Sequence, residues 1–394
     1  MLTPETLAAL QTTYADLLDE LAQADLSAAR VLPLLTHLRK FYPSEIAAAA
    51  LQTAQLRRKG ALKFEHAAHM FFTDEALQQA TTQTVAEHHA RILMGYNTIA
   101  DLGCGIGGDS IALGKNASDP SASVIGVDLD RLRLQMARHN AAVYGANASF
   151  IQADLTHPLP IRDIPAAFFD PARRSDHKRI FSVQDYIPPL DSVQQWGFRA
   201  MLTKLSPGVD INELRYLQSG TEFVSESGDL KEALLHSGDL AFTGFRATRL
   251  PEGETLHSQG FEPPPVSDQL RRYLYEPDPA VIRSGLFSEM LKHIGLQAYR
   301  LDETIAYLTG DQWLENPWIR GWRIDDWMPF NLKKLRAALR HYSVGSVTVK
   351  KRGSPITPEE LQKKLALKKG DGEGHAVVIL TRLQGQPVAL ISLD

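Results

Sequence analysis

The sequence has 394 residues, a formal net charge of −4 at pH 7 and a hydrophobic content of 44%, which is enough for two or three domains that each bury a core. No apolar run approaches the roughly 20 residues that span a bilayer, and the first residues lack the basic start and apolar stretch of a secretion signal, so we expect a cytoplasmic protein with no membrane partner. The single cysteine, Cys104, excludes an internal disulfide and a cysteine-based zinc site, and we expect no bound metal.

The N-terminal part, residues 1–95, is predicted to be helical. Ala, Leu and Gln dominate it, apolar residues recur at three- and four-residue spacing, and no alternating stretch appears. From Thr98 onward, short apolar runs alternate with helical stretches, as is typical of a parallel sheet with crossover helices. The predicted strands are 98–100, 124–128, 149–154 and 166–170, with further candidates at 198–205, 221–225 and 241–250, and the predicted helices are 110–115 and 131–144.

Turn-forming residues follow this predicted sheet. Pro251, Gly253, Gly260 and the three prolines at 263–265 predict a hinge. Beyond the hinge, predicted helices alternate with predicted strands, which indicates a small α+β domain: the helices are 280–295 and 331–342, and the strands are 346–351, 375–382 and 387–393. We therefore expect three domains, at residues 1–95, 96–262 and 263–394.

Charge is unevenly distributed in the last third of the chain. Residues 331–370 contain eleven Lys and Arg against two Glu, a net charge of +9, whereas residues 251–330 carry a net charge of −6. A basic segment on a mildly acidic protein favours a polyanionic partner. Four tryptophans that precede the segment are more typical of packing than of base stacking: Trp313, Trp318, Trp322 and Trp327.

A glycine-rich loop follows the strand predicted at 98–100. In a doubly wound sheet, ligands bind at the carboxyl ends of the strands, where the first loop has to let a ligand approach the backbone. Residues 101–109, with the sequence DLGCGIGGD, supply Gly103, Gly105, Gly107 and Gly108 for this purpose. The same segment also satisfies the dinucleotide-binding pattern G-x-G-x-x-G, with an acid, Asp128, twenty residues after the last glycine of that pattern.

The charge of Asp101 distinguishes the two cofactors. A dinucleotide would place its pyrophosphate beside this loop, where a carboxylate just before the first glycine would repel it. The methionine half of S-adenosylmethionine presents an ammonium and a sulfonium, for which a carboxylate is favourable, directly or through water. Asp101 therefore predicts that the loop binds S-adenosylmethionine.

Two more acids end the next two predicted strands. Asp128 is placed to accept hydrogen bonds from both ribose hydroxyls, and Asp154 from the adenine amino group. A carboxylate at such a position can instead cap a helix or a loop. For the helix at 131–144, Asp130 fits the capping role better than Asp128, and for Asp154 the capping alternative stays open.

Several separate segments resemble known methyltransferases. Residues 81–88, 101–109, 124–130 and 137–145 are similar to trimethylguanosine synthase, and this likeness covers residues 79–171. Over nearly the whole chain, the sequence resembles bacterial RNA methyltransferases with a C-terminal THUMP-like domain. The shared segments are FDPARR at 169–174, KLSPGVD at 204–210 and VTVKKRG at 347–353.

The resemblance implies an α/β fold with a Rossmann-like class I methyltransferase core, that is, a mainly parallel seven-stranded sheet, flanked by an N-terminal helical domain and a C-terminal α+β THUMP-like domain. It implies S-adenosylmethionine as the cofactor and RNA as a partner. It also implies that Thr81, in the segment that matches the synthase's cofactor-contacting threonine, helps to hold the methionine carboxylate, to which a helix N-terminus would contribute. Thr81 could instead be only a helix cap.

The acceptor site is predicted at the end of the fourth strand. The resemblance to amino-methyltransferases implies Asp/Asn/Ser-Pro-Pro-aromatic there, whose polar side chain and proline-flanked carbonyl accept hydrogen bonds from the amine while the ring stacks on the base. Asp170 and Pro171 match, whereas Ala172 and Arg173 replace the second proline and the aromatic residue. We expect Asp170 to orient the amine and stabilise the charge that it gains, and Arg173 to stack on a base or pair with phosphate. Asp170 could instead cap the next turn.

Two further features allow alternatives. Carbon methylation of pyrimidines uses a thiolate nucleophile, but the position of Cys104 inside the cofactor loop favours packing. A basic loop follows the acceptor motif and is either an RNA contact or a solvated surface: Arg173, Arg174, His177, Lys178 and Arg179.

Together these patterns favour an RNA methyltransferase that modifies an exocyclic base nitrogen, of the guanine N2 or adenine N6 type. One alternative is a methyltransferase of a protein or a small molecule. The other is an RNA-binding protein whose core has lost activity, against which the presence of Asp101, Asp128, Asp154 and Asp170 argues.

Overall fold

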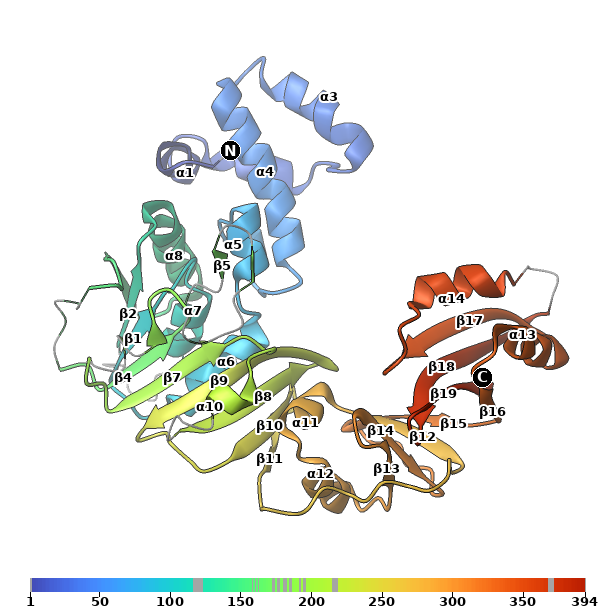
Figure 1. The fold of residues 1–394 in the computed structure, drawn as a ribbon. Helices are drawn as coiled ribbons and strands as arrows, with labels where there is room; N and C mark the ends of the chain where they lie inside the picture. The colour runs from blue at the N-terminus through green and yellow to red at the C-terminus, as the bar shows by residue number, and fades with distance from the viewer. Residues whose placement is uncertain are drawn as a thin grey trace. The chain divides into compact units, whose positions relative to one another are not determined.

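The computed structural model divides the chain into two compact units, which are described separately (Figure 1). The first unit comprises residues 1–222 and 232–243, and the second comprises residues 223–231 and 244–394. The structure describes residues 2–115, 123–157, 159, 161, 163–171, 174–175, 178–179, 183, 186–190, 193, 196–214, 219–367 and 372–393. Among these residues, no helix is long and apolar enough to cross a membrane. The division into three domains that we expect from the sequence stays a prediction.

The N-terminal part of the first unit is helical, as predicted. Its first five helices contribute apolar side chains to a single core, which also includes Ile106 of the glycine loop and Met136. Thr3 and Thr6 form a reciprocal cap at the first helix. The helices are α1 (Pro4–Gln11), α2 (Ala15–Ala22), α3 (Ala28–Leu38), α4 (Ser44–Gly60), α5 (Asp74–Gln79) and α6 (Gln83–Ile92), with a 3-10 turn at Ala67–His69.

Nine strands form the main sheet: β1 (Thr98–Leu102), β2 (Ser123–Asp128), β3 (Ala148–Gln152), β4 (Ala166–Phe169), β7 (Ala200–Leu205), β8 (Gly220–Glu226), β9 (Asp229–Gly238), β10 (Phe245–Leu250) and β11 (Glu254–His257). Their order is β11-β10-β8-β9-β7-β4-β1-β2-β3. β3, β2, β1, β4 and β7 run parallel, and β9 is antiparallel to β7. β4 and β7 are buried along their whole length: β4 is continuously apolar, as expected of a strand in a covered sheet, whereas β7 also buries Thr203 and Lys204.

Helix α7 (Gly108–Lys115) connects β1 to β2 and α8 (Arg131–Tyr144) connects β2 to β3, as the alternating pattern predicts. The short strands β5 (Arg174–Ser175) and β6 (Lys178–Arg179) lie between β4 and β7, and α10 (Ile211–Leu214) follows β7. The expected doubly wound α/β fold is confirmed, with nine strands in the sheet rather than seven. The sequence patterns missed β9 because Glu232 and His236 interrupt its apolar run, and the partners that neutralise these buried side chains lie elsewhere in the chain.

The second unit contains two four-stranded sheets, in the orders β13-β14-β12-β15 and β16-β19-β18-β17. The strands are β12 (Tyr273–Pro277), β13 (Tyr299–Asp302), β14 (Ile305–Gly310), β15 (Ile319–Arg323), β16 (Asp326–Pro329), β17 (Val344–Lys351), β18 (Gly374–Leu383) and β19 (Gln386–Leu393). The helices are α11 (Pro279–Ser284), α12 (Phe287–Ile294), α13 (Leu332–His341) and α14 (Pro358–Leu365). The helix predicted at 280–295 is two helices, because Gly285 takes a left-handed conformation between them.

Strand β18 separates two cores of the second unit. Successive side chains of a strand point to opposite faces. Val378 and Leu380 therefore pack with the apolar faces of α13 and α14. Val377 and Ile379 pack with residues of β12, β14 and β15. This arrangement leaves the outer faces of α13 and α14 for charged residues.

Asn140 of α8 connects the helical segment to the glycine loop. Its side chain is fully buried, and its Oδ1 accepts a hydrogen bond from the Phe71 amide at 2.9 Å. Its Nδ2 donates to the carbonyls of Phe71 and Ile106, both at 3.1 Å. Asn140 thereby satisfies three backbone groups that regular secondary structure leaves without partners.

Replacing Asn140 by alanine would leave these three buried groups without their partner. We expect Asn140→Ala to lower the free energy of unfolding by about 2–4 kcal/mol, as measured by urea denaturation. Asn97→Ala, at an exposed asparagine just before β1, is the control and should change it by less than about 0.5 kcal/mol. Equal effects of the two variants would show that the Asn140 hydrogen bonds do not stabilise the fold.

Candidate active site

The loop between β1 and α7 is held against two neighbouring strands. Gly103, Gly105 and Gly107 have φ of 87°, 53° and 83°, a region that favours glycine. The amide of Gly103 donates to the carbonyl of Val127 at 2.9 Å. A Cβ on Gly103 would lie 2.5 Å from the carbonyl oxygen of Asp170, so no side chain fits there. A Cβ on Gly105 would meet nothing within 4 Å, which leaves open space beside the backbone.

Asp101 lies buried beneath this loop. Its Oδ2 accepts a hydrogen bond from Ser110 Oγ at 2.5 Å, and its Oδ1 has no hydrogen-bond partner among the residues described. Burial, and then the carboxylates of Asp109, Asp170 and Asp128, raise the pKa of Asp101 to about 8. A buried carboxylate oxygen without a partner is stabilised by a cation. The site therefore fits the methionine ammonium that the sequence predicts here.

Asp128 is tied to the glycine loop at the end of β2. Its Oδ2 accepts a hydrogen bond from the Gly105 amide at 2.9 Å, and its Oδ1 accepts one from the Asp130 amide at 2.9 Å. Asp130, not Asp128, caps α8, as predicted. Because each carboxylate oxygen has two lone pairs, Asp128 can still accept hydrogen bonds from ribose hydroxyls. Its cofactor contact stays a prediction.

Asp154 lies in a turn after β3, and its side chain is 47% exposed. Its Oδ1 accepts hydrogen bonds from the amide and the hydroxyl of Thr156, which lower the pKa of Asp154. This is the capping arrangement that we considered as the alternative. The Ala153 amide donates to the carbonyl of Asp128, which keeps Asp154 beside the second strand end. The predicted adenine contact stays a prediction.

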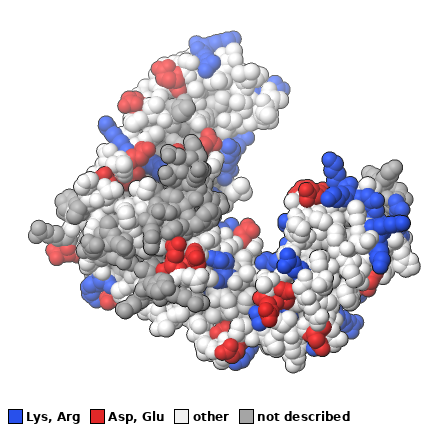
Figure 2. All heavy atoms as spheres, in the orientation of Figure 1, with Lys and Arg blue, Asp and Glu red and all other residues white. Residues whose placement is uncertain are grey.

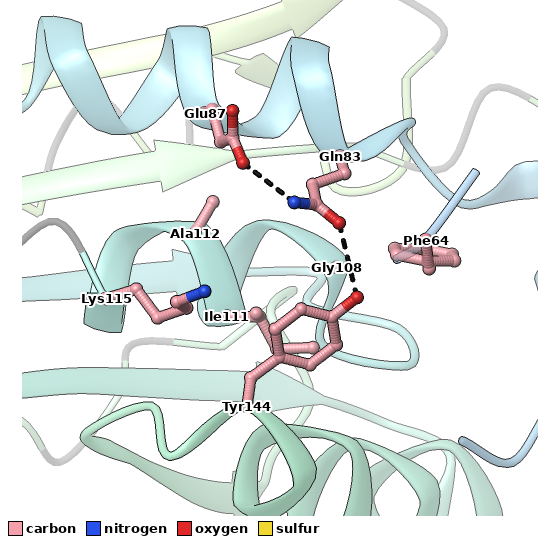
Figure 3. Close-up of a pocket in the computed structure, with 8 residues that line it drawn as sticks. All are labelled: Phe64, Gln83, Glu87, Gly108, Ile111, Ala112, Lys115 and Tyr144. Carbon is pink, nitrogen blue, oxygen red and sulfur yellow. Dashed lines mark hydrogen bonds between the residues drawn. The ribbon is translucent and has the colours of Figure 1, made fainter. Parts of the chain in front are cut away.

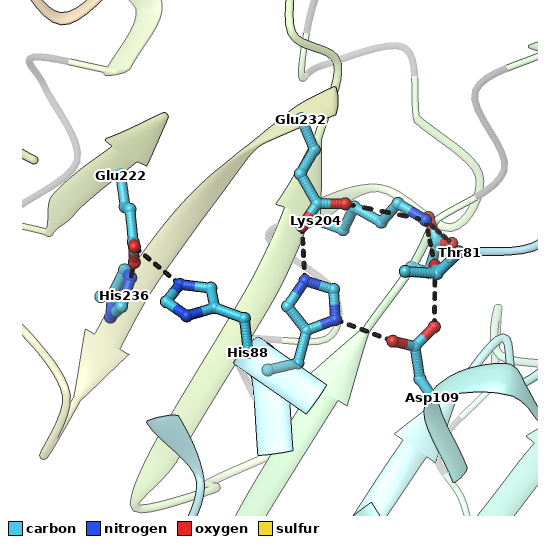
Figure 4. A network of polar contacts seen from close by, with 9 residues as sticks. Thr81, His88, Asp109, Lys204, Glu222, Glu232 and His236 are labelled. Atoms are coloured by element: carbon cyan, nitrogen blue, oxygen red, sulfur yellow. Dashed lines mark hydrogen bonds and ion pairs between the residues drawn. The ribbon is translucent and has the colours of Figure 1, made fainter. Parts of the chain in front are cut away.

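Asp170, the predicted acceptor residue, has a buried cationic partner that the sequence patterns did not predict. Lys204, from the end of β7, donates to Asp170 Oδ2 and to Thr81 Oγ1, both at 2.9 Å. Thr81 in turn donates to Asp109 at 3.0 Å (Figure 4). A hydroxyl has one hydrogen, so Thr81 must exchange this bond to donate to a methionine carboxylate. The cap of α6 is Thr82, so Thr81 is not the helix cap.

Asp109, His89 and Glu232 continue this network into a closed ring. Asp109 Oδ1 lies 2.7 Å from His89 Nδ1, and His89 Nε2 hydrogen bonds to Glu232. Glu232 Oε2 lies 4.0 Å from Lys204 Nζ, which closes the ring. Burial disfavours a charged His89, but Glu232 and Asp109 outweigh it and raise the pKa of His89 to about 10. His89 is therefore an imidazolium at neutral pH.

A second buried pairing lies outside this ring. His88 of α6 and His236 of β9 both hydrogen bond to Glu222 of β8, at 2.7 and 2.8 Å (Figure 4). The adjacent histidines of α6 thus each meet a buried glutamate. His88 and His89 standing together on a predicted helix is the sequence signal that could have marked these networks. The sequence patterns did not predict the strand that supplies Glu232.

The remaining predicted residues fall in different places. Pro171 is buried directly after Asp170, and Arg173 lies outside the described residues. So do the side chains of the basic loop that follows. Cys104 is buried, and burial, followed by the nearby carboxylates, raises the pKa of its thiol well above the usual value. A thiol in that state is a poor nucleophile, which supports the packing role.

A pocket of the first unit is lined by Gly108 of the glycine loop but by none of the predicted site acids (Figure 3). It lies over α6 and α7, with Phe64 and Tyr144 among its lining residues. Gln83 bridges it by donating to Glu87 at 2.9 Å and accepting from the Tyr144 hydroxyl at 3.3 Å. The cofactor site is therefore assigned from Asp101 and the glycine loop, not from this pocket.

The raised pKa of Asp101 predicts proton release when the cofactor binds. An ammonium beside the carboxylate favours its ionised form, so binding lowers a pKa of about 8. We expect S-adenosylhomocysteine to bind with release of roughly one proton at pH 7 and with an affinity that rises from pH 6 to pH 8. Calorimetry in buffers of different ionisation enthalpy measures the protons released. Asp101→Asn should abolish the release, and a wild-type heat that does not depend on the buffer would contradict the prediction.

Comparisons with known proteins find similarity to methyltransferases and to a THUMP-like family. Family profiles match at three places: a methyltransferase domain at residues 99–171, a THUMP domain-like family at 319–392 and a domain of unknown function at 3–60. The chain is 45% identical over 64 residues to a 23S rRNA (uracil(1939)-C(5))-methyltransferase of Marinomonas posidonica, which is 16% of this chain and 14% of that protein. A crystal structure described as a methyltransferase of Porphyromonas gingivalis has the same fold, with a TM-score of 0.74, 19% identity and coverage of 93% of this chain and 98% of that one.

A longer match establishes the family. The chain is 35% identical over 345 residues to an uncharacterized S-adenosylmethionine-dependent methyltransferase of Mycobacterium tuberculosis, which covers 84% of this chain and 92% of that protein. The Asp-x-Gly-x-Gly-x-Gly loop and the partnerless oxygen of Asp101 fit the same cofactor. The chain therefore belongs to the class I S-adenosylmethionine-dependent methyltransferases, and it carries a THUMP-like domain at its C-terminal end.

Proposed function

We propose that this enzyme methylates RNA at an exocyclic nitrogen of a base, of the guanine N2 or adenine N6 type. The observation that carries the proposal is the carboxylate of Asp170 at the end of β4, beside the glycine loop and paired with Lys204. Asp170-Pro171 matches the start of the motif with which amino-methyltransferases hold an amine. The sequence resemblance to RNA methyltransferases and the 23S rRNA methyltransferase of the comparison support an RNA acceptor.

The reaction needs little acid–base chemistry from the protein. When bound, S-adenosylmethionine would supply the methyl group of its sulfonium: the acceptor nitrogen forms a bond to that methyl carbon in line with the carbon–sulfur bond, which breaks and releases S-adenosylhomocysteine. The main task of the enzyme is to hold the amine in that line, because correct orientation is worth up to about 7–11 kcal/mol. Asp170 accepts a hydrogen bond from the amine and stabilises the positive charge that develops on the nitrogen. The same carboxylate can then accept the proton that the methylated nitrogen loses.

A basic face of the THUMP-like domain supports a polyanionic substrate. Figure 2 shows Lys and Arg side chains gathered over α13 and α14. Lys333 and Lys334 of α13 and Lys363 and Lys364 of α14 are exposed, while leucines of both helices pack against the sheet. Cations spread over adjacent helices suit the repeated phosphates of a nucleic acid. We name these four lysines the basic helix face.

Not every cation of the basic segment is free to contact RNA. Lys350 and Arg352 both pair with Glu276, at 3.4 and 2.8 Å, and both are partly buried. Their side chains also lie over the rings of Trp322 and Tyr307, at 5.1 and 5.6 Å from the centroids. These two cations therefore contribute to the packing of the domain, and the basic helix face supplies exposed charge that RNA could contact.

The tryptophans divide into two pairs. Trp318 and Trp322 are 1% and 5% exposed and belong to the core, as predicted. Trp313 and Trp327 are 44% and 45% exposed. Trp313 packs over Gly321, where a Cβ would lie 2.8 Å from its ring, and beside Tyr273, with ring centroids 5.3 Å apart. Trp313 therefore also contributes to packing.

Methylation of uracil C5, the activity printed for the Marinomonas relative, has less support in this chain. That chemistry uses a thiolate nucleophile. The one cysteine of the sequence, Cys104, is buried in the cofactor loop with a raised pKa. We therefore carry over from this relative only the RNA substrate class.

Removing the carboxylate of Asp170 should separate methyl transfer from cofactor binding. We expect Asp170→Ala to reduce transfer from tritiated S-adenosylmethionine to RNA of a strain that lacks this protein by roughly 100- to 1,000-fold. The affinity for S-adenosylhomocysteine should stay within about threefold, because the predicted cofactor contacts remain. Asp229→Ala, at a side chain that is 80% exposed, is the control. Nucleoside mass spectrometry should find a methylated exocyclic nitrogen, whereas label in protein or in 5-methyluridine would contradict the proposal.

The basic helix face should set the salt dependence of RNA binding. Changing Lys333, Lys334, Lys363 and Lys364 to alanine should weaken binding and reduce the slope of log K against log salt by roughly 0.7–0.9 for each phosphate that the protein no longer neutralises. Gel shifts over a salt series measure the slope. A control with the same change of charge replaces exposed cations of the first unit by alanine: Arg30, Arg39, Lys40 and Arg91. Equal slopes in the quadruple variant and the wild type would remove the basic helix face from the proposal.

A further inference from the structure

Lys204 occupies a position where three parallel strands end together. The registers pair Leu102 of β1 with Phe169 of β4, and Phe169 with Thr203 of β7. Asp170 and Lys204 are therefore the next residues of adjacent strands, and the Asp170 amide donates to the Leu102 carbonyl at 3.0 Å. The side chain of Lys204 is only 6% exposed. A buried ammonium thus lies at the edge of the sheet where methyl transfer is proposed.

The ring described above gives this ammonium a defined position. Three oxygens surround it, from Asp170, Thr81 and Glu232, at 2.9, 2.9 and 4.0 Å. His89 bridges Glu232 to Asp109, and Asp109 accepts the hydrogen bond of Thr81, so each neighbour of Lys204 is itself held. A buried charge is stable only with such compensation. A lysine needed only to neutralise Asp170 would not require the rest of the ring.

Charge also distinguishes the two forms of the cofactor at this position. S-adenosylmethionine carries a sulfonium, and the product S-adenosylhomocysteine carries a neutral thioether in its place. The carboxylates of Asp101, Asp109 and Asp170 affect one another closely enough to raise the pKa of Asp101. Carboxylates alone would favour the sulfonium form and hold the substrate form of the cofactor more tightly than the product. A fixed cation among them opposes that preference.

We propose that Lys204 is the fixed cation of the methyl-transfer centre, where it holds Asp170 toward the acceptor and reduces the preference of the site for the sulfonium over the thioether. Glu232 and His89 act through Lys204 and are positioning residues. The inference rests on the proposed role of Asp170 as the acceptor carboxylate. It goes beyond that role, because it assigns a function to a residue that no cofactor motif contains.

The ratio of the two cofactor affinities tests the proposal. A variant that only loosens the fold weakens the binding of S-adenosylmethionine and S-adenosylhomocysteine alike. The two compounds share their ammonium and carboxylate, so a change of charge in the site alters the ratio of their affinities only through the sulfonium. We expect Lys204→Met to shift the ratio toward S-adenosylmethionine by roughly 5- to 30-fold, which corresponds to about 1–2 kcal/mol for the loss of one unit charge near the sulfonium. Lys204→Arg keeps the charge and should leave the ratio within about twofold of the wild type. Calorimetry with both compounds at pH 7.5 and low salt gives the ratios.

Two glutamates of the β8–β9 hairpin provide a matched pair. Glu232→Gln removes a negative charge from the ring and should shift the ratio toward S-adenosylhomocysteine, by roughly two- to fivefold. Glu222 is equally buried and pairs with histidines, but it lies outside the ring. Glu222→Gln should lower the thermal stability without changing the ratio. Lys204→Met and Glu232→Gln should shift the ratio in opposite directions. If Lys204→Met does not fold, Glu232→Gln therefore still tests the proposal.

The outcomes separate this inference from the proposed function. Ratios within twofold of the wild type in both Lys204→Met and Glu232→Gln would overturn the inference, whatever the acceptor is. The measurement of the affinity ratios needs no acceptor. Label found in protein instead of RNA would therefore overturn the proposed substrate but would not affect the test of Lys204. A shift as large in Glu222→Gln as in Glu232→Gln would also overturn the inference, because the ring would then have no special part.

Discussion

The active site depends on the compensation of buried charge where β1, β4 and β7 end. Asp101, Asp109, Asp170 and Glu232 are brought together there, and a cluster of carboxylates out of water is unfavourable unless cations or protons balance it. Lys204 contacts oxygens of Asp170, Thr81 and Glu232, and His89 connects Glu232 to Asp109. Asp101 is the member that the described cations do not touch, and its pKa is raised to about 8. A cationic cofactor would balance this remaining negative charge of Asp101.

The backbone of the glycine loop brings this charge cluster to the ligand. Gly103 lies so close to the Asp170 carbonyl that the first glycine and the acceptor motif are coupled by contact. The Gly105 amide holds Asp128, and the Asn140 side chain holds the Ile106 carbonyl. The loop therefore positions the predicted ribose and methionine contacts with one set of backbone groups, and the helical N-terminal segment stabilises it from the other side.

The THUMP-like domain separates packing charges from surface charges. Because β18 is covered on both faces, its apolar side chains contribute to two cores. Lys350 lies in the neighbouring strand β17 and Arg352 comes directly after it. Both pair with the carboxylate of Glu276 and balance its charge. The lysines of the basic helix face point away from these cores. A segment with a net charge of +9 therefore divides into cations that stabilise the domain and cations that remain for a polyanion.

The sequence by itself determined the features that depend on near neighbours. Alternation, apolar runs and glycine spacing reveal the parallel strands, the N-terminal helices and the cofactor loop, and the charge of Asp101 selects the cofactor. Only the tertiary structure decided which polar side chains contact one another. Lys204 and Thr81 are 123 residues apart in the sequence, His89 and Glu232 are 143 apart, and Lys350 and Glu276 are 74 apart. Strand β9 escaped prediction for the same reason, since its buried Glu232 looks unfavourable until His89 is placed beside it. A local pattern records the side chain, but the free energy of burying its charge depends on partners that only the fold brings near.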